Sequence, residues 1–166
     1  MRPYDVAILL KIACKGQQNW LMKDLSHELE ISASEISESI NRSVIAGLLG
    51  SDKKSLNKLA LLDFLKSGLP YVYPQQPGAL VRGMATVHSA PPLNKKIASD
   101  EHFVWPYANG NVRGQAITPL HPKIPEACIK DAKFYELMAL TDAIRVGKVR
   151  EWKMAVEMLK ERIEDA

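Results

Sequence analysis

Hydrophobic residues recur at every fourth position through two neighbouring runs of the chain, and a short polar break separates the runs. The first run is Leu21, Leu25 and Leu29, and the second is Ile36, Ile40, Val44 and Leu48. Each run places its members on one side of a helix. The break contains Ser32 and Glu35, whose side chains can each accept a hydrogen bond from the other's backbone amide, as in a capping box. The pattern predicts two helices joined by a tight turn.

The second helix is expected to present a polar edge to solvent. Its positions outside the apolar stripe are Ser34, Ser37, Glu38, Asn41, Arg42 and Ile45. Asparagine and arginine hydrogen-bond adenine and guanine edges in the DNA major groove, so Asn41 and Arg42 are the expected base-reading residues. The alternative is a helical hairpin that serves only for packing or for protein contact.

Three segments of this region follow one another in a family-like order: Leu25-x3-Leu29-x-Ile31-Ser32, then Glu35-Ile36-Ser37, then Ala46-Gly47-Leu48-Leu49. Together they resemble the corresponding run of MarR-like winged helix-turn-helix transcriptional regulators. The resemblance implies a winged-helix DNA-binding unit in the N-terminal part, whose second helix, 33–48, enters the major groove. Many members of that family have glycine at the place of Glu30, where a left-handed turn conformation costs glutamate more.

Two further helices are expected to flank this pair. Pro3 suits a first helical turn, and the apolar spacing after it predicts a helix that ends at Gly16 and packs across the back of the pair. Residues 55–67 are apolar on nearly all sides, which predicts a helix covered by other elements or by a dimer partner. Gly68 and Pro70 are expected to end that helix.

Residues 70–124 are expected to form strands and loops. Nine of the ten prolines lie between Pro70 and Pro125, which argues against long helices there. Short extended pieces are predicted at 71–73, 79–88 and 111–118, with turns at 75–78 and 107–110. The second turn contains an Asn-Gly dipeptide, which is typical of β-hairpins.

A VRGxA motif occurs twice, at 81–85 and 112–116, and each copy follows an aromatic-proline pair and a turn. The repetition predicts a pseudo-symmetric pair of hairpins. In one interpretation Arg82 and Arg113 grip phosphates, and the adjacent glycines let the backbone come close. In the other, each arginine pairs with an acidic neighbour and the glycines mark bulges. The sequence does not decide between the two.

The C-terminal quarter is expected to form two helices joined at Gly147. Asp131 can cap the first helix, and the second, 148–163, has one apolar side and a face of alternating charges. This hairpin either packs onto the rest of the chain or supplies a surface for a dimer or another partner.

Composition permits nucleic-acid binding without requiring it. The 166 residues carry a formal net charge of +3, and residues 1–58 contain eight Lys/Arg against seven Asp/Glu, so phosphate contacts alone predict modest affinity. Cys14 and Cys128 are far apart in the sequence, which favours buried thiols in a reducing compartment. No apolar run approaches the roughly 18 residues of a membrane span. We therefore expect a cytoplasmic protein without membrane contact.

No catalytic or cofactor motif is present in the sequence. The four histidines lack metal-ligand spacing, and neither a glycine-rich phosphate loop nor a nucleophile elbow occurs. We expect no catalytic residues, no metal and no cofactor. An enzyme acting on RNA or nucleotides is the least favoured hypothesis.

These patterns predict an α+β fold in three parts: a winged-helix-like helix-turn-helix domain at 1–69, a proline-rich strand region at 70–124 and a C-terminal helical hairpin at 125–166. The favoured function is a sequence-specific DNA-binding transcriptional regulator that acts as a homodimer on double-stranded DNA. The alternative is a protein-interaction module, such as an antitoxin- or adaptor-like subunit, that binds a partner protein through the C-terminal helices. The residues expected at DNA are Lys23, Ser32, Ser34, Ser37, Glu38, Asn41, Arg42, Lys53, Lys54, Lys58, Arg82 and Arg113.

Overall fold

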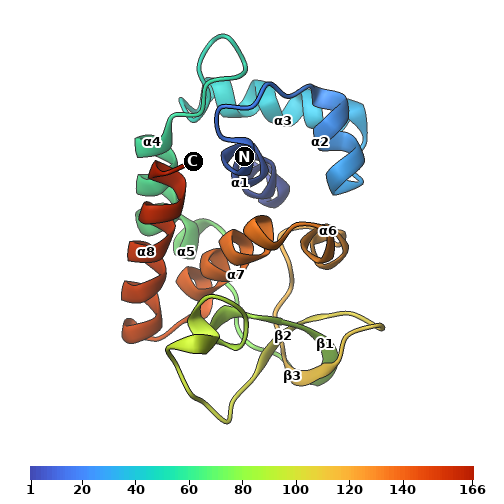
Figure 1. Ribbon diagram of the computed structural model, residues 1–166, viewed down its shortest axis with the longest axis vertical. Helices are drawn as coiled ribbons and strands as arrows, with labels where there is room; N and C mark the ends of the chain where they lie inside the picture. The colour runs from blue at the N-terminus through green and yellow to red at the C-terminus, as the bar shows by residue number, and fades with distance from the viewer.

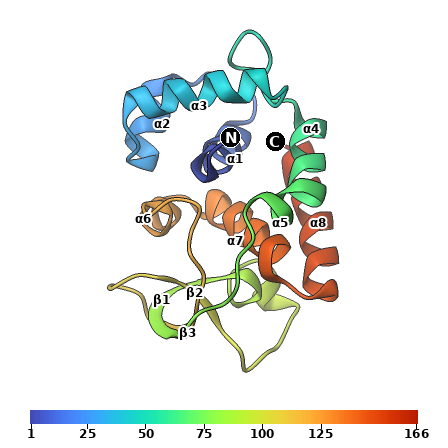
Figure 2. The ribbon, with the colours of Figure 1, turned by 180° about the vertical axis from the view of Figure 1, so that it is seen from behind.

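The computed structural model describes residues 1–166 and has an α+β fold of packed helices and a small three-stranded sheet. Helix α1 (Pro3–Lys15) lies between the pair α2 (Met22–Leu29) and α3 (Ala33–Ile45) on one side and α6 (Ile124–Lys130) and α7 (Ala132–Val146) on the other (Figure 1). The strands lie beyond α7. Seen from both sides, α3 and the sheet occupy opposite ends of the molecule (Figures 1 and 2).

Helix α1 is buried on every side along residues 5–13. Its apolar run packs against α2 and α3, as the sequence predicts, and also against α7. Two charged side chains, Asp5 and Lys11, are buried with it, and only 0% and 4% of their surface is exposed. A buried charge is tolerated only when it is paired, so both must have partners in neighbouring elements.

The helical segment after the α2–α3 pair is longer than expected. It runs through α4 (Lys58–Asp63), one π-helical turn (Phe64–Gly68) and α5 (Leu69–Val72). The prediction that Gly68 and Pro70 end the helix is wrong, as is the extended segment at 71–73 for its first two residues. Pro70 sits in the first turn of α5, where its missing N–H removes no helical hydrogen bond.

The sheet consists of β1 (Leu80–Thr86), β2 (Phe103–Pro106) and β3 (Val112–Ala116). Strand β1 pairs antiparallel with both others, and β2 and β3 pair in parallel, so the three strands close on themselves. The predicted strands at 79–88 and 111–118 are confirmed, whereas β2 was not predicted. The Asn-Gly dipeptide lies in a turn, but the strands on either side of it do not form a hairpin with each other.

The two VRGxA copies pair with each other in register. Val81 lies opposite Gly114, Arg82 opposite Arg113, and Gly83 opposite Val112. A Cβ atom on Gly83 would lie 2.0 Å from the Trp105 carbonyl oxygen, so glycine is what lets β2 approach β1 this closely. The glycines of the repeated motif therefore have a packing role.

The C-terminal part contains one more helix than expected. Helix α6 precedes the predicted pair, and Asp131 then caps α7 as predicted, because its side chain accepts a hydrogen bond from the Phe134 amide at 3.1 Å. Helices α7 and α8 (Val149–Glu164) pack against each other. None of the helices combines the length and the apolar character needed to cross a bilayer.

A buried polar network joins α7 to the sheet and to the chain before it. The Asp142 carboxylate, 1% exposed, accepts hydrogen bonds from Thr86 at 2.8 Å and from the Trp105 indole at 2.6 Å. Arg145 binds its other oxygen at 2.9 Å and donates to the carbonyl oxygens of Tyr73 and Thr118. Burial raises the pKa of the Asp142 carboxyl, while Arg145 and the two neutral donors act in the opposite direction.

One hydrophobic cluster of 37 buried residues includes side chains from all three predicted parts of the chain. It extends from Val6 in α1 through Leu93 and Trp105 in the proline-rich region to Ile163 in α8. The proline-rich and C-terminal parts therefore bury their apolar side chains in the same core as the helix-turn-helix part.

We expect Asp142→Ala to lower the free energy of unfolding by about 3–5 kcal/mol, because it leaves the Arg145 guanidinium buried without a counter-ion. The measurement is urea denaturation. The matched control is Glu136→Ala, whose partner Arg162 is about one-third exposed, and its loss should be at most about 1 kcal/mol. Equal losses in the two variants would contradict a structural role for the buried pair.

Candidate nucleic-acid interface

The turn between α2 and α3 is fixed by local hydrogen bonds. Ser32 caps α3 by accepting from the Glu35 amide at 3.3 Å, and Glu35 accepts in return from the Ser32 amide at 3.4 Å, which confirms the predicted capping box. Glu30 ends α2 in the left-handed conformation, with φ of 53°. The Ser26 hydroxyl donates to the Ile31 carbonyl at 2.6 Å and closes the turn from the inside. The angle between the two helices is therefore determined before any ligand binds.

Helix α3 presents an exposed ridge on the side away from α1. Its members lie four, three and four residues apart and are all exposed: Ser34, Glu38, Asn41 and Ile45. Ser37 lies beside the ridge and is partly buried. Asn41 is exposed, as the sequence predicts. In both views no later helix or strand lies on the side of α3 away from α1 (Figures 1 and 2).

Arg42 does not point outward with Asn41, as the sequence analysis expected. Its guanidinium binds the buried carboxylate of Asp5 with both oxygens engaged, at 2.9 Å from Nε and 2.8 Å from Nη2, and lies over the Tyr4 ring. Only 25% of the Arg42 side chain is exposed. The prediction that Arg42 points outward and reads bases is therefore wrong. Arg42 lies on the flank of α3 and binds this helix to α1.

This ion pair changes the titration of both partners. Burial alone raises the pKa of Asp5, but the hydrogen bonds from Arg42 and from the Arg2 amide outweigh it, so the net pKa is lowered. The hydrogen bonds to Asp5 raise the pKa of Arg42 in turn. Both groups are charged at neutral pH, and their attraction holds α3 in place.

A small β-bridged loop follows α3. Leu49 bridges Leu56 in antiparallel fashion, and the Asn57 amide donates to the Leu48 carbonyl at 2.9 Å. At the tip, the Asp52 carboxylate accepts hydrogen bonds from the Ser55 hydroxyl at 2.5 Å and from two backbone amides. These hydrogen bonds lower the pKa of Asp52 to about 2, and the bond from the Ser55 hydroxyl has the largest effect. We call residues 48–57 the hairpin loop. It projects beyond the C-terminal end of α3 (Figure 1).

The expected phosphate-contacting lysines are not equivalent in the structure. Lys53, at the tip of the hairpin loop, and Lys23, on α2, are exposed and form no ion pair. Lys54 lies 4.1 Å from the centre of the Trp20 ring and donates to the Trp20 carbonyl, which attaches the hairpin loop to the segment between α1 and α2. Lys58 donates to the carbonyl oxygen of Ala166 at 2.7 Å and so faces the end of α8.

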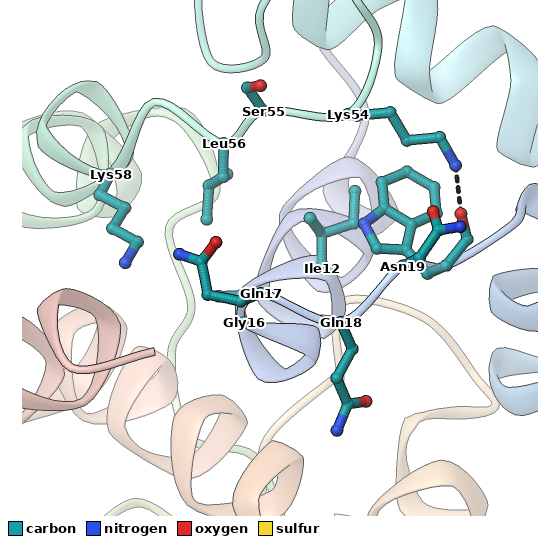
Figure 3. Close-up of a pocket in the computed structure, with 11 residues that line it drawn as sticks. Ile12, Gly16, Gln17, Gln18, Asn19, Lys54, Ser55, Leu56 and Lys58 are labelled. Carbon is teal, nitrogen blue, oxygen red and sulfur yellow. Dashed lines mark hydrogen bonds between the residues drawn. The ribbon is translucent and has the colours of Figure 1, made fainter.

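A pocket of about 390 Å³ lies where the hairpin loop meets the segment after α1 (Figure 3). Lys54 and Lys58 line it from the hairpin-loop side, and Gln17 and Asn19 line it from the other side; no carboxylate side chain is among its lining residues. The hairpin loop is thus anchored at its base, and its tip remains free.

Arg82 and Arg113 do not join this surface. Both are exposed on the sheet, at the end of the molecule opposite to α3 (Figures 1 and 2). Any duplex lying along the α3 ridge is therefore remote from these two arginines, and the structure separates them from the other expected DNA contacts.

Few cations of the N-terminal unit remain available for phosphates. Of the eight Lys/Arg in residues 1–58, Lys11 binds Asp131, Lys15 binds Glu28 and Arg42 binds Asp5. Lys58 is held by backbone carbonyls. Lys54 is held by the Trp20 carbonyl and ring. The exposed cations that remain are Arg2, Lys23 and Lys53.

Two histidines, His88 and His121, and both cysteines lie in partly or fully buried positions. No group of three histidine, cysteine, aspartate or glutamate side chains lies in an arrangement that could hold a metal ion. His88 is bonded to the Glu101 carbonyl at 2.9 Å, and burial lowers the pKa of His121. Burial also raises the pKa of both Cys14 and Cys128, which keeps the two thiols protonated.

Comparison of the chain with protein-family models, with curated proteins and with solved structures finds no significant match.

Sequence reasoning missed three contacts that shape the interface: the Asp5–Arg42 pair, the Trp20–Lys54 contact and the Leu49–Leu56 bridge. A signal for the first was present. Asp5 opens an apolar run that extends from Val6 to Leu10, which indicates that its carboxylate lies near the core and needs a cation as partner. The other two contacts leave no periodic pattern in the sequence.

The Asp5–Arg42 pair predicts a specific loss of stability in acid. The pKa of Asp5 is lower in the folded chain than in the unfolded chain, where it is about 3.9. Its stabilisation is therefore complete above about pH 5 and is lost as the pH falls through the folded pKa. Asp5→Asn should lower the free energy of unfolding by about 3 kcal/mol at pH 7, and this difference from the parent chain should shrink below pH 4.

The measurement is urea denaturation between pH 3 and pH 7. Asp63→Asn, at an exposed position of α4, is the control and should track the parent chain across the range. A difference between Asp5→Asn and the parent that does not depend on pH would contradict the assigned ion pair.

Proposed function

We propose that the chain is a sequence-specific DNA-binding regulator whose helix α3 enters the major groove of double-stranded DNA. The observation that carries the proposal is the α3 ridge: a helix held at its cap, at its turn and on its flank, with Asn41 and its neighbours left uncovered. A second helix after a short turn, fixed to its partner and exposed along one face, has the geometry with which helix-turn-helix proteins present side chains to base edges.

The hairpin loop supports a winged-helix version of this proposal. In such an arrangement a β-hairpin follows the recognition helix and its tip meets the DNA backbone beside it. Here Lys53 is exposed at the tip, while Lys54 and Trp20 anchor the base. In this proposal Lys53 and Lys23 contact phosphates, which fix register, and Asn41, Glu38, Ser34 and Ser37 contact bases. Two chains related by a two-fold axis would place their ridges about one DNA turn apart.

A protein partner is the second candidate function, and the exposed apolar residues favour it. Ile45, at the C-terminal end of the α3 ridge, is 88% exposed, and Leu59 on α4 is 79% exposed. Leu59 also borders an apolar groove between α4 and α8. Co-purification of one defined polypeptide, together with no affinity for heparin or DNA, would favour this candidate over the first.

Asn41→Ala is expected to reduce discrimination between bound and unbound sequences by about 1–3 kcal/mol, because a bidentate asparagine–adenine contact contributes on that scale. The measurement is a competition gel shift on fragments selected from random DNA. Asn111→Ala, an exposed asparagine near the sheet, is the matched control and should leave the preference unchanged.

Arg42→Ala tests, in the same assay, whether Arg42 stabilises the fold or contacts a base. Because its guanidinium is bound to Asp5, the variant should lose stability without a change of preference at a single base position. An unchanged preference in Asn41→Ala, in a variant that is folded by circular dichroism, would overturn the role assigned to the α3 ridge.

The affinity for DNA should fall less steeply with salt concentration than is usual for a DNA-binding protein. Three exposed cations of the N-terminal unit are free, so the logarithm of the binding constant should fall against the logarithm of salt concentration with a slope of at most about 3 per chain. Lys53→Ala should reduce that slope by about 1 and weaken all sequences alike. A slope that is the same in Lys53→Ala and in the parent would exclude the hairpin tip from the interface.

A further inference from the structure

The two motif arginines face each other across the sheet. Arg82 and Arg113 are directly opposite in the antiparallel register of β1 and β3, and both are exposed. Along each strand the residues on either side of the arginine are more buried: Val81 and Gly83 in β1, Val112 and Gly114 in β3. The repeated VRG triplet thus places its valine and glycine toward the interior and its arginine outward on both strands.

Neither arginine has an acidic partner. No carboxylate lies within 4.0 Å of either guanidinium, and neither one donates a hydrogen bond to another part of the chain. The arginines elsewhere that do bind carboxylates are Arg42, Arg145 and Arg162. The interpretation in which each motif arginine pairs with an acidic neighbour is therefore not supported by the geometry.

Two like charges in this position repel each other. Side chains directly opposite on an antiparallel pair have Cβ atoms about 5 Å apart, and like charges there destabilise the sheet. The sheet nevertheless carries the same arginine at the matching position of both strands. An anion that bridges the two guanidinium groups would turn this repulsion into attraction.

We infer that Arg82 and Arg113 form a binding site for a phosphate group. Each guanidinium fork can direct two N–H donors at one oxyanion, so two forks offer four donors and two positive charges to a bound anion. A carboxylate carries one negative charge on two oxygens, so it offsets only one of the two guanidinium charges. A phosphate group has three or more acceptor sites and carries about two negative charges when it is a monoester, so it can accept from both arginines at once.

This site is independent of the proposed function. It lies at the end of the molecule opposite to the α3 ridge, so one phosphate backbone along α3 does not reach it (Figures 1 and 2). The same chemistry is offered by a small phosphorylated molecule and by the backbone of a nucleic-acid strand, and the arms of the experiment distinguish these sources.

The test follows the arginine side-chain Nε–H signals by NMR during titration with inorganic phosphate at constant ionic strength. The Arg82 and Arg113 signals should shift saturably with phosphate, and shift far less with acetate or chloride. Arg82→Gln and Arg113→Gln should each weaken phosphate binding about tenfold, since a charge-assisted hydrogen bond contributes on that scale. Arg150→Gln, at an exposed arginine of α8, is the matched control and should bind like the parent.

A stability measurement gives an independent readout. In low-salt buffer without phosphate, Arg82→Gln should raise the midpoint of thermal unfolding because it removes the repulsion. Phosphate should raise the midpoint of the parent chain and of Arg150→Gln, but not that of Arg82→Gln. Equal responses of all the variants, or NMR shifts that acetate reproduces, would overturn the site.

The two possible sources of the phosphate group are distinguished by comparing the affinities of a mononucleotide and of a short single-stranded oligonucleotide. Equal affinity per molecule identifies a small phosphorylated ligand, and much tighter binding of the oligonucleotide identifies a nucleic-acid strand. Loss of either response in Arg82→Gln supports the site. Retention of both responses in Arg82→Gln refutes it, whatever happens at the α3 ridge.

Discussion

The fold depends on the neutralisation of two charges carried by a helix that has no exposed side. Helix α1 is buried along residues 5–13, yet Asp5 and Lys11 lie within that stretch. Asp5 binds Arg42 of α3 at 2.8 Å, and Lys11 binds Asp131, at the N-terminus of α7, at 2.6 Å. An unpaired charge in either place would cost several kcal/mol, so each pair specifies which element lies on which side of α1. The hydrophobic contacts around α1 contribute most of its stabilisation, and the two ion pairs determine how the helix is oriented.

The same logic operates at the other end of the molecule. Asp142 and Arg145 are both nearly inaccessible, and together they bind side chains or carbonyls from β1, β2 and the segments before and after the sheet. A three-stranded sheet of this size has little apolar area with which to fix its own position. The buried network of Asp142 and Arg145 fixes the position of the sheet instead. Burial of these polar groups is tolerated only when every donor meets its acceptor, which allows one placement of the strands.

How much of this could be predicted from the sequence depends on how local each cause is. The Ser32–Glu35 capping box, the Asp131 cap and the two VRGxA strands involve residues within a few positions of one another, and the structure confirms all of them. Helix α5 was missed because proline was treated as a terminator, although it is tolerated in a first turn. Strand β2 is only four residues long and exists because the glycines of the other strands admit it.

The interface shows the same limit. The expected stripe of Ile36, Ile40, Val44 and Leu48 packs against the core, but Ser39 and Ser43 are buried as well. The buried side of α3 is therefore wider than the stripe, and Arg42 lies on its flank, where it binds Asp5, 37 residues earlier in the sequence. Periodicity alone cannot detect this, because serine counts as polar in the pattern even where it is fully buried.

The fixation of the α2–α3 turn has a consequence for recognition. Ser26, Ser32 and the left-handed Glu30 fix the conformation of the turn. The ion pair of Arg42 with Asp5 holds the flank of α3 against α1, so the α3 ridge is pre-organised. A surface that is already ordered loses little conformational entropy when a partner covers it. Short side chains such as Ser34 and Asn41 also have few rotamers to immobilise. A chain with so few free cations can therefore rely on rigidity, more than on charge, to distinguish one partner from another.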